Sequence, residues 1–243
     1  MVQLNVLWVI LACISSYFIG SIPFSVWLGK LFYKKDLREF HTKNPGGINA
    51  IVTYGATLGL PVLFLDFFKG TLTILLLDKI FSNAHFEPAS GINLWHIFAC
   101  VFGSLFCVLG HQYSPFLKFG GGQGIGIFVG VLFYVNPLIL VIFILMMIPL
   151  MNMIKLDVSH ANIVDVILVV LMSIFLPIGP PWNSILNAWV KGSTGFVHML
   201  LFLICTALAI GLLQKFLVKQ IRGRRKWSFT FKKGPQDKIE SEQ

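Results

Sequence analysis

Residues 125–154 read IGIFVGVLFYVNPLILVIFILMMIPLMNMI, an apolar run of thirty residues without one charged side chain. A helix that crosses a bilayer needs about 20 apolar residues, so this run predicts a membrane-embedded segment and is too long for one upright span. Pro137 stands near its middle, and proline inside a helix removes a hydrogen-bond donor and clashes with the preceding turn. We therefore predict that two helices meet at Asn136 and Pro137.

The composition of the whole chain also indicates a membrane protein. Of its 243 residues, 56% are hydrophobic and only 12% are charged, and the mean hydropathy is +0.80. Soluble domains usually carry about 25% charged residues. These values exclude an ordinary soluble enzyme, a disordered chain and a nucleic-acid-binding domain, so no nucleic-acid partner is expected. Four cysteines lie in apolar runs without metal-ligand spacing and are expected to be small core residues: Cys13, Cys100, Cys107 and Cys205.

The remaining apolar runs complete a prediction of seven membrane spans. They are residues 6–29, 51–77, 92–109, the two parts of 125–154, 161–177 and 197–217. The first run is too long for the apolar part of a signal peptide, so we expect it to be retained as a span.

The orientation follows from the basic residues. The loop 30–43 and the segment 219–243 are both rich in lysine and arginine, which places both on the cytoplasmic side. Seven spans satisfy this condition, with the N-terminus outside and the C-terminus cytoplasmic. We thus expect an all-α integral membrane protein, with one membrane-embedded domain over 1–218 and a basic cytoplasmic tail over 219–243 that binds anionic lipid head groups.

Two glycine-bearing loops are predicted to share the cytoplasmic face. Residues 42–49 read TKNPGGIN, and residues 120–124 read GGGQG and open a helix. Glycine lets backbone amides turn toward a ligand, and the start of a helix adds a partial positive charge, so the loops could form a phosphate site. The alternative is that they only connect tightly packed helices, because neither loop is a Walker A or dinucleotide-binding motif.

Three ionisable residues accompany these loops. Asp66 and Lys69 lie three residues apart in a predicted span, a spacing that lets them meet on one helical face. Such a pair inside a membrane is either functional or a structural pair that faces the bundle interior. His111 precedes the second loop, where it could donate to an oxyanion or hold the loop backbone. His96 has no neighbouring partner in the sequence and is expected to be structural or interfacial.

Several short motifs follow one another over about residues 20–130: GSIPF at 20–24, DLR at 36–38, NPGGIN at 44–49, DFFKG at 66–70 and GHQYSPFLKFGGGQG at 110–124. Together, in this order, they resemble the bacterial acyl-phosphate:glycerol-3-phosphate acyltransferases of the PlsY type. Members of that family are seven-span membrane enzymes, so the resemblance implies a multi-pass protein of the cell membrane.

The resemblance implies a membrane acyltransferase of phospholipid synthesis. Family members move a fatty acyl group from acyl phosphate to glycerol 3-phosphate, without a metal, a cofactor or acyl-CoA. By this resemblance we expect Thr42, Asn44 and His111 to be catalytic. The residues expected to bind substrate are Arg38, Lys43, Gly46, Asn49, Gly121, Gly122, Gln123 and Gly124.

The chain departs from the family pattern at several positions. The family serine falls on Thr42 and its phosphate-binding arginine on Val52, while the lysine of the second loop falls on Gln123. The late family motif with its histidine and asparagine is absent. Arg38, Lys43 and Lys118 are predicted on the same face and could supply the missing charge. The alternative function is a non-catalytic relative that binds a phosphorylated lipid precursor or scaffolds lipid enzymes.

Overall fold

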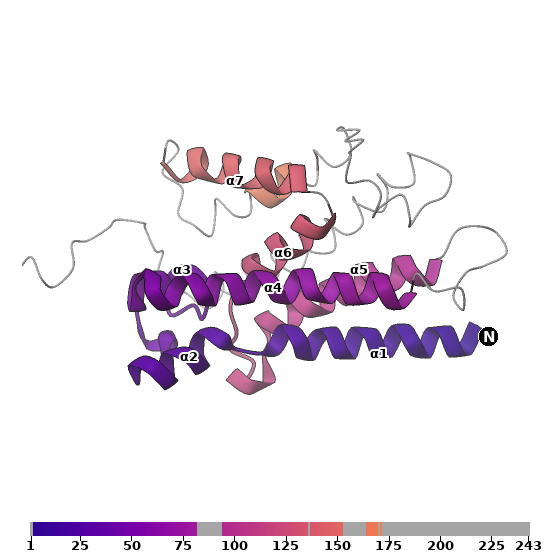
Figure 1. Ribbon diagram of the computed structural model, residues 1–243, viewed down its shortest axis with the longest axis horizontal. Coiled ribbons are helices and arrows are strands. Elements are labelled where there is room, and N and C mark those ends of the chain that lie inside the picture. Colours follow the sequence, from indigo (N-terminus) through magenta and orange to yellow (C-terminus); the bar gives the residue numbers. More distant parts are fainter. Residues whose placement is uncertain (1, 82–93, 136, 153–163, 170, 172–243) are drawn as a thin grey trace, which may run out of the picture.

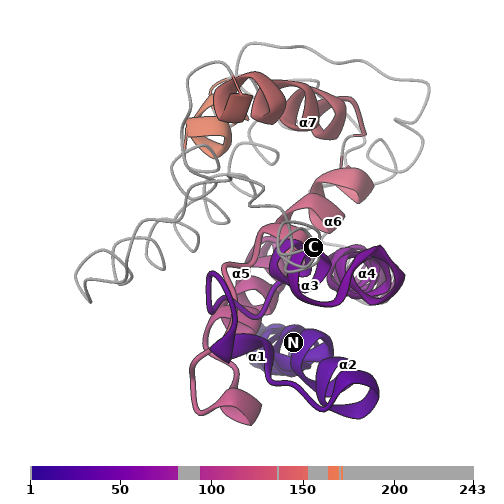
Figure 2. The same cartoon turned by 90° about the vertical axis from the view of Figure 1, so that its left-hand side faces the viewer.

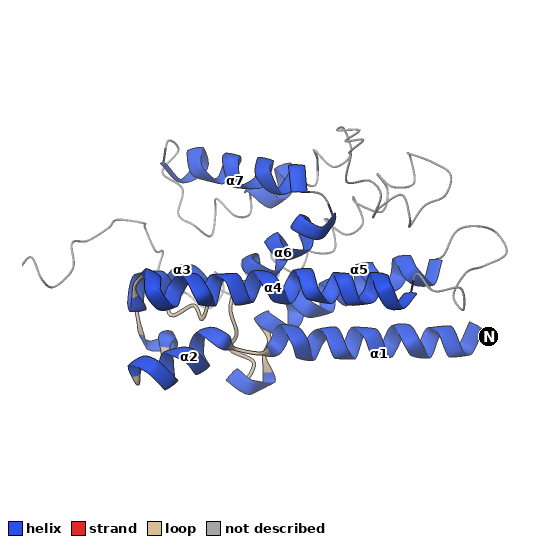
Figure 3. Ribbon diagram, viewed as in Figure 1, coloured by secondary structure: helices blue, strands red, loops and turns tan. Residues whose placement is uncertain are grey.

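The computed structural model describes residues 2–81, 94–135, 137–152, 164–169 and 171. Every regular element in these ranges is helical (Figure 1, Figure 3). The labelled elements are α1 (Val2–Ser21), α2 (Phe24–Tyr33), η1 (Leu37–Glu39), α3 (Gly47–Tyr54), α4 (Ala56–Phe81), α5 (Leu94–Gln112), η3 (Pro115–Leu117), α6 (Ile125–Val135) and α7 (Pro137–Asn152). The predicted all-α class is therefore confirmed for this part of the chain.

Three helical stretches in the described ranges are long and apolar enough to cross a membrane: Asn5–Tyr33, Ala56–Phe81 and Leu94–Leu117. Their outward faces carry large apolar side chains, such as Trp8, Phe18 and Phe64, which are 46%, 51% and 62% exposed. In water such a surface would be unfavourable, whereas lipid chains cover it at no cost. The separation of α6 from α7 confirms the predicted break at Pro137. The predicted span 197–217 and the tail lie outside the described residues, as does most of 161–177.

The helices are arranged in layers. Helices α1 and α2 lie on one side of α4 and α5, and α6 and α7 lie on the other side (Figure 1, Figure 2). Glycines allow the closest contacts between the layers. A Cβ at Gly20 of α1 would collide with the backbone of Cys107 in α5, and one at Gly130 of α6 would collide with the backbone of Phe67 in α4. Membrane helices typically pack through such small residues because backbones can then approach closely.

The first predicted span, residues 6–29, lies within the apolar stretch Asn5–Tyr33, but the helix in it is interrupted. Helix α1 ends at Ser21, and α2 begins at Phe24 after Pro23. Proline has no N–H to continue the ladder of hydrogen bonds, so the chain makes a short non-helical segment there. The carbonyl groups released by this break become part of the site described below.

The predicted span 51–77 also needs correction. Its first four residues belong to α3, and α4 begins only after Gly55, whose φ of +78° ends the preceding helix. Helices α3 and α4 form an antiparallel hairpin: a Cβ at Gly59 would collide with Ile51, and one at Gly47 would collide with Leu63. Because of this hairpin, the start of α3 lies beside Leu63 of α4, about one helical turn before Asp66.

Candidate active site

A cavity of about 730 Å³ lies among the two glycine-bearing loops and helices α4, α6 and α7. Its polar lining includes Thr42, Asn44, Asn49, Asp66, His111 and Gln123. Its apolar lining includes Leu60, Leu63, Phe64, Phe67, Val129, Phe143 and Ile144. Residues about 75 positions apart in the sequence thus line one cavity, so the structure brings the two predicted loops together.

Two helices begin at this cavity. Helix α3 starts after Gly46 and α6 starts after Gly124, and both glycines line the cavity together with the residues that follow them. The first intrahelical hydrogen bonds are those from Ala50 N to Gly46 O, at 3.0 Å, and from Phe128 N to Gly124 O, also at 3.0 Å. The amides of the first turn therefore have no acceptor within their own helix. Two sets of such amides at one cavity favour an anionic ligand.

Asn49 fixes the loop that precedes α3. The residue is 2% exposed, and its Nδ2 donates to the carbonyl oxygens of Leu37, Phe40 and Asn44 at 3.2, 3.3 and 2.9 Å. Three acceptors around one nitrogen determine the orientation of the amide, because a flipped amide would place oxygen against oxygen. Its Oδ1 is buried and has no hydrogen-bond partner within the described ranges.

The second loop folds back on the end of α5. The amides of Gly121 and Gly122 donate to the carbonyl oxygens of Gln112 and His111, at 3.1 and 3.0 Å, and the Gln112 side chain donates to Gln123 O at 2.8 Å. A Cβ at Gly121 would collide with the backbone of His111, and one at Gly122 would collide with its imidazole. These glycines are therefore required by packing. Gln123 and Gly124 line the cavity, while Gly121 and Gly122 are not among the described residues that line it.

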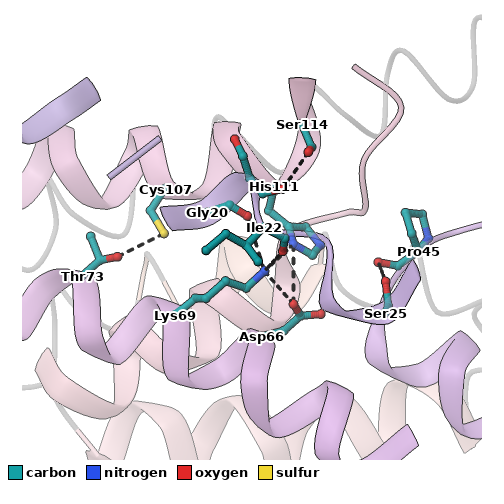
Figure 4. A network of polar contacts seen from close by, with 11 residues as sticks. Gly20, Ile22, Ser25, Pro45, Asp66, Lys69, Thr73, Cys107, His111 and Ser114 are labelled. Carbon is teal, nitrogen blue, oxygen red and sulfur yellow. Dashed lines mark hydrogen bonds and ion pairs between the residues drawn. The ribbon is translucent and has the colours of Figure 1, made fainter. Parts of the chain in front are cut away.

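A buried cluster of three ionisable side chains lies beside the cavity (Figure 4). Lys69 Nζ is 2.8 Å from Asp66 Oδ1 and 3.5 Å from His111 Nδ1, while the Asp66 and His111 atoms are 3.8 Å apart. The side chains are 4%, 5% and 8% exposed for Lys69, Asp66 and His111, respectively. Asp66 and His111 line the cavity, whereas Lys69 lies behind them. The predicted meeting of Asp66 with Lys69 is thus present.

Lys69 also closes the break between α1 and α2. Its ammonium donates to the carbonyl oxygens of Ile22 and Gly20, at 2.9 and 3.4 Å (Figure 4). It also lies 5.4 Å from the centre of the Phe24 ring. A buried ammonium requires such partners, because an unpaired charge in an apolar interior is strongly unfavourable. The proline break supplies two acceptors that a continuous helix would have used internally.

The basic residues that were predicted to supply positive charge to the site, Arg38, Lys43 and Lys118, are not among the described residues that line the cavity. Arg38 makes a bidentate pair with Asp36, with distances of 3.0 and 2.8 Å, and Lys30 is 3.0 Å from the same carboxylate. The hydrogen bond from Arg38 holds the pKa of the Asp36 carboxyl well below its usual range, with Lys30 adding to the effect. Lys43 and Lys118 are exposed. No lysine or arginine is among the described residues that line the cavity, and neither is Val52.

One polar cluster was missed by the sequence analysis. His96 Nε2 lies 3.1 Å from Asp78 Oδ1, and the Tyr134 hydroxyl donates to Asp78 Oδ2 at 2.6 Å. His96 was predicted to be structural or interfacial, without a partner that its spacing could identify, and the structure supplies Asp78 as that partner. The available signal was topological: Asp78 and His96 lie near the two ends of the segment that joins the predicted spans 51–77 and 92–109, so they are expected on the same membrane face. Cys13, Cys100 and Cys107 are buried, as expected, and Cys205 lies outside the described residues.

These features define the class of protein: a helical membrane protein whose internal cavity combines an apolar lining with polar loops and two helix N-termini. Within the described ranges, no group of three or more potential metal-ligating residues could hold a metal ion.

Comparison with known proteins identifies the family. The family model described as glycerol-3-phosphate acyltransferase matches residues 10–218. Glycerol-3-phosphate acyltransferases of Staphylococcus aureus, from strains Newman and bovine RF122, are each 34% identical over 168 residues, which is 69% of this chain and 80% of theirs. This chain belongs to the glycerol-3-phosphate acyltransferase family.

Two solved structures share the fold. Both are crystal structures of PlsY (YgiH), an integral membrane glycerol 3-phosphate acyltransferase, and both are 27% identical to this chain. The glycerol 3-phosphate form has a TM-score of 0.61 and covers 95% of this chain and 98% of its own. The lysophosphatidic acid form has a TM-score of 0.60, with 91% and 95% covered.

Proposed function

We propose that this protein transfers a fatty acyl group from acyl phosphate to glycerol 3-phosphate at the cavity. The observation that carries this proposal is the meeting of two helix N-termini with an apolar lining in one cavity. A phosphorylated head group suits the amides, and an acyl chain suits the apolar helices. The names of the Staphylococcus aureus relatives and of the PlsY structures support the same activity.

The reaction needs little acid–base machinery. The hydroxyl oxygen of glycerol 3-phosphate attacks the acyl carbonyl carbon, a new ester bond forms, and the bond between that carbon and the phosphate oxygen breaks. The hydroxyl proton leaves with the phosphate. Since acyl phosphate is already activated, the protein has to place the hydroxyl against the carbonyl and stabilise the negative charge that develops.

The residues around the cavity suit these tasks. We assign the anion-binding role to the first-turn amides of α3 and α6 and to the side chain of Gln123, with Asn44 and Thr42 beside the reacting groups. Asn49 holds the loop in place through its three hydrogen bonds. His111 borders the same cavity and can contact a substrate oxygen.

The apolar lining offers a place for the acyl chain. Leu60 and Phe64 of α4 border the cavity and are also 54% and 62% exposed, so they connect the cavity with the lipid-facing surface. In this proposal the acyl chain enters from the bilayer between α4 and α7.

The proposal also includes the topology of the whole chain. It has seven spans in the plasma membrane, with the N-terminus outside and the C-terminus in the cytoplasm. Residues 1–218 form one domain, and residues 219–243 form a tail that binds anionic lipids.

One observation favours the second candidate, a non-catalytic binder of a phosphorylated lipid precursor. The described cavity lining has a carboxylate, Asp66, but no lysine or arginine. Asp66 is neutralised by Lys69, so the site is not repulsive, yet its attraction for phosphate rests on amides and dipoles alone.

Turnover separates the two candidates. Purified full-length protein in lipid nanodiscs is given an acyl phosphate and labelled glycerol 3-phosphate, and the lysophosphatidic acid formed is measured. The enzyme proposal expects product in wild type and a large loss in Asn44→Ala. Binding of glycerol 3-phosphate without any product in wild type would favour the second candidate.

A further inference from the structure

We propose that Ser25 and Ser114 are positioning residues, which tie the two glycine-bearing loops to the break between α1 and α2. The task of these loops, the binding of one phosphate, rests on the proposed function. The contacts that join the loops to the break lie within the described residues and can be tested without substrate. Both serines are buried, at 2% and 1% exposed.

The break after α1 makes backbone carbonyl groups available to other parts of the chain. In a continuous helix, the carbonyl oxygen of Ser21 would accept from the amide four residues later. Here it accepts from the hydroxyl of Ser114, at 2.6 Å and across 93 residues of sequence. Lys69 donates to the neighbouring carbonyl oxygens of Gly20 and Ile22, at 3.4 and 2.9 Å (Figure 4). Three consecutive carbonyl groups are therefore each bound by a side chain from a distant part of the chain.

The first loop is tied to the other side of the break. Ser25, in the first turn of α2, donates from its hydroxyl to the carbonyl oxygen of Pro45 at 2.8 Å (Figure 4). Pro45 lies between Asn44 and Gly46, which both line the cavity. Because a peptide group is planar, fixing this carbonyl also fixes the amide of Gly46, directly before α3.

The second loop is reached through Ser114, which directly precedes η3. The carbonyl oxygen of Ser114 accepts from the amides of Leu117 and Phe119, at 3.1 and 2.8 Å, and closes the turn that leads to residues 120–124. The hydroxyl of Ser114 holds this turn against the end of α1. The last two residues of the loop line the cavity. Ser114 therefore determines where the chain enters the second loop.

The two serines give the loops a common support. Asn49 holds the first loop internally, and the end of α5 holds the second, so these local bonds set the shape of each loop. The serines join both loops to one short segment, residues 20–25, in addition to the packing of α3 and α6 on α4. A phosphate between the two helix starts needs both loops in place at once, so each serine strengthens its binding.

The first test measures the distance between the loops without substrate. Genetically encoded spin-labelled amino acids replace Lys43 and Lys118, which are exposed and lie in the two tied segments. Distances are recorded by pulsed electron double resonance on the full-length protein in lipid nanodiscs. We expect a narrow distribution in wild type that shifts or broadens in Ser25→Ala and in Ser114→Ala. An unchanged distribution in either variant would overturn the role of that serine.

Ser16→Ala is the matched control, because it removes a similar bond that holds no loop. Ser16 is 2% exposed, and its hydroxyl donates to the carbonyl oxygen of Ala12 at 2.7 Å, within α1. This variant should keep the wild-type distances. Ser25→Thr and Ser114→Thr retain the hydroxyl and should keep them as well. A change in Ser16→Ala, or threonine variants that behave like the alanine variants, would contradict a role of the two hydrogen bonds.

Binding then connects the loops with the proposed function. We expect glycerol 3-phosphate to bind about three- to tenfold more weakly to Ser25→Ala and to Ser114→Ala, the range for one lost hydrogen bond. Ser16→Ala and both threonine variants should stay within about twofold of wild type. Wild-type affinity in the alanine variants would contradict the positioning role even if the distances change. If wild type binds no glycerol 3-phosphate, the proposed function fails, and the distances alone decide whether the serines position the loops.

Discussion

Nδ2 of Asn49 donates a hydrogen bond of 2.9 Å to the carbonyl oxygen of Asn44, so the first turn of α3 holds the loop from which that helix begins. The same nitrogen also bonds the carbonyl oxygens of Leu37 and Phe40. A single buried side chain thus connects three points of the segment between α2 and α3. The position of this loop at the cavity depends on that connection.

We predict that Asn49→Asp lowers the stability of the protein more than Asn44→Ala does. A carboxylate at residue 49 would face three carbonyl oxygens, which leaves buried acceptors unpaired and costs about 1–3 kcal/mol or more in stability. Asn44 is only half-buried, and its side chain lies against Gly46 at the cavity. Thermal unfolding in nanodiscs should show a lower Tm for Asn49→Asp, whereas Asn44→Ala should lose activity with little change in Tm. Equal Tm values for the two variants would refute the role of Asn49.

Gly122→Ala should disturb the site, and Gly120→Ala should not. The added methyl at 122 would collide with the His111 imidazole, while at 120 the nearest contact is Leu117 O at 3.2 Å, on the exposed part of the loop. Overpacking of this kind typically costs about 1–3 kcal/mol. The two variants are compared by Tm and by binding of glycerol 3-phosphate. A Gly120→Ala variant that is as impaired as Gly122→Ala would argue against contact of the loop with His111.

The cluster of Asp78, His96 and Tyr134 should support stability rather than activity. Asp78 lies twelve residues beyond Asp66 on α4, which corresponds to about 18 Å along a helix. Loss of the 2.6 Å hydrogen bond in Tyr134→Phe should lower the free energy of unfolding by about 1–3 kcal/mol. KM and kcat should remain at wild-type values. A changed KM in a folded Tyr134→Phe variant would show that the cluster acts on the cavity.

Gln123→Lys should tighten the binding of glycerol 3-phosphate, and Val52→Arg alone should change it little. Gln123 lines the cavity, so a lysine there adds a cation beside the two helix starts. Val52 is 38% exposed and is not among the described lining residues. We expect about a tenfold gain for Gln123→Lys that diminishes at higher salt. A gain in Val52→Arg of the same size would mean that α3 sits differently when substrate is bound.

Several features of the fold and the site could be predicted from the sequence because they depend on local chemistry. The uncharged run 125–154 indicates a membrane protein, and Pro137 marks the boundary between α6 and α7. The spacing of Asp66 and Lys69 predicts their contact, because residues three apart share a helical face. The glycines of the two loops predicted one shared phosphate site, and the structure brings residues of both loops to one cavity.

Other parts depend on contacts between distant residues and could not be read from the sequence. Pro23 and Gly55 were visible, but each stands in an apolar run, and hydropathy does not show where a helix is interrupted, as at Pro23, or turns back, as at Gly55. The acceptors of Lys69 lie 47 and 49 residues away, in the break after α1. Arg38 differs from these cases, because its partner is local: its charge suggested phosphate, whereas it pairs with the carboxylate of Asp36, two residues away.

The central claim is that the N-termini of α3 and α6 hold one phosphate. The most direct measurement is ³¹P–¹⁵N dipolar dephasing in protein labelled at glycine nitrogen and saturated with glycerol 3-phosphate. Gly47 and Gly126 lie in the first turns of the two helices and line the cavity, and Gly55, in the turn between α3 and α4, is the internal control. We expect dephasing of the Gly47 and Gly126 amides by the phosphorus and none at Gly55. Dephasing at only one of the two helices, or at neither with ligand bound, would contradict it.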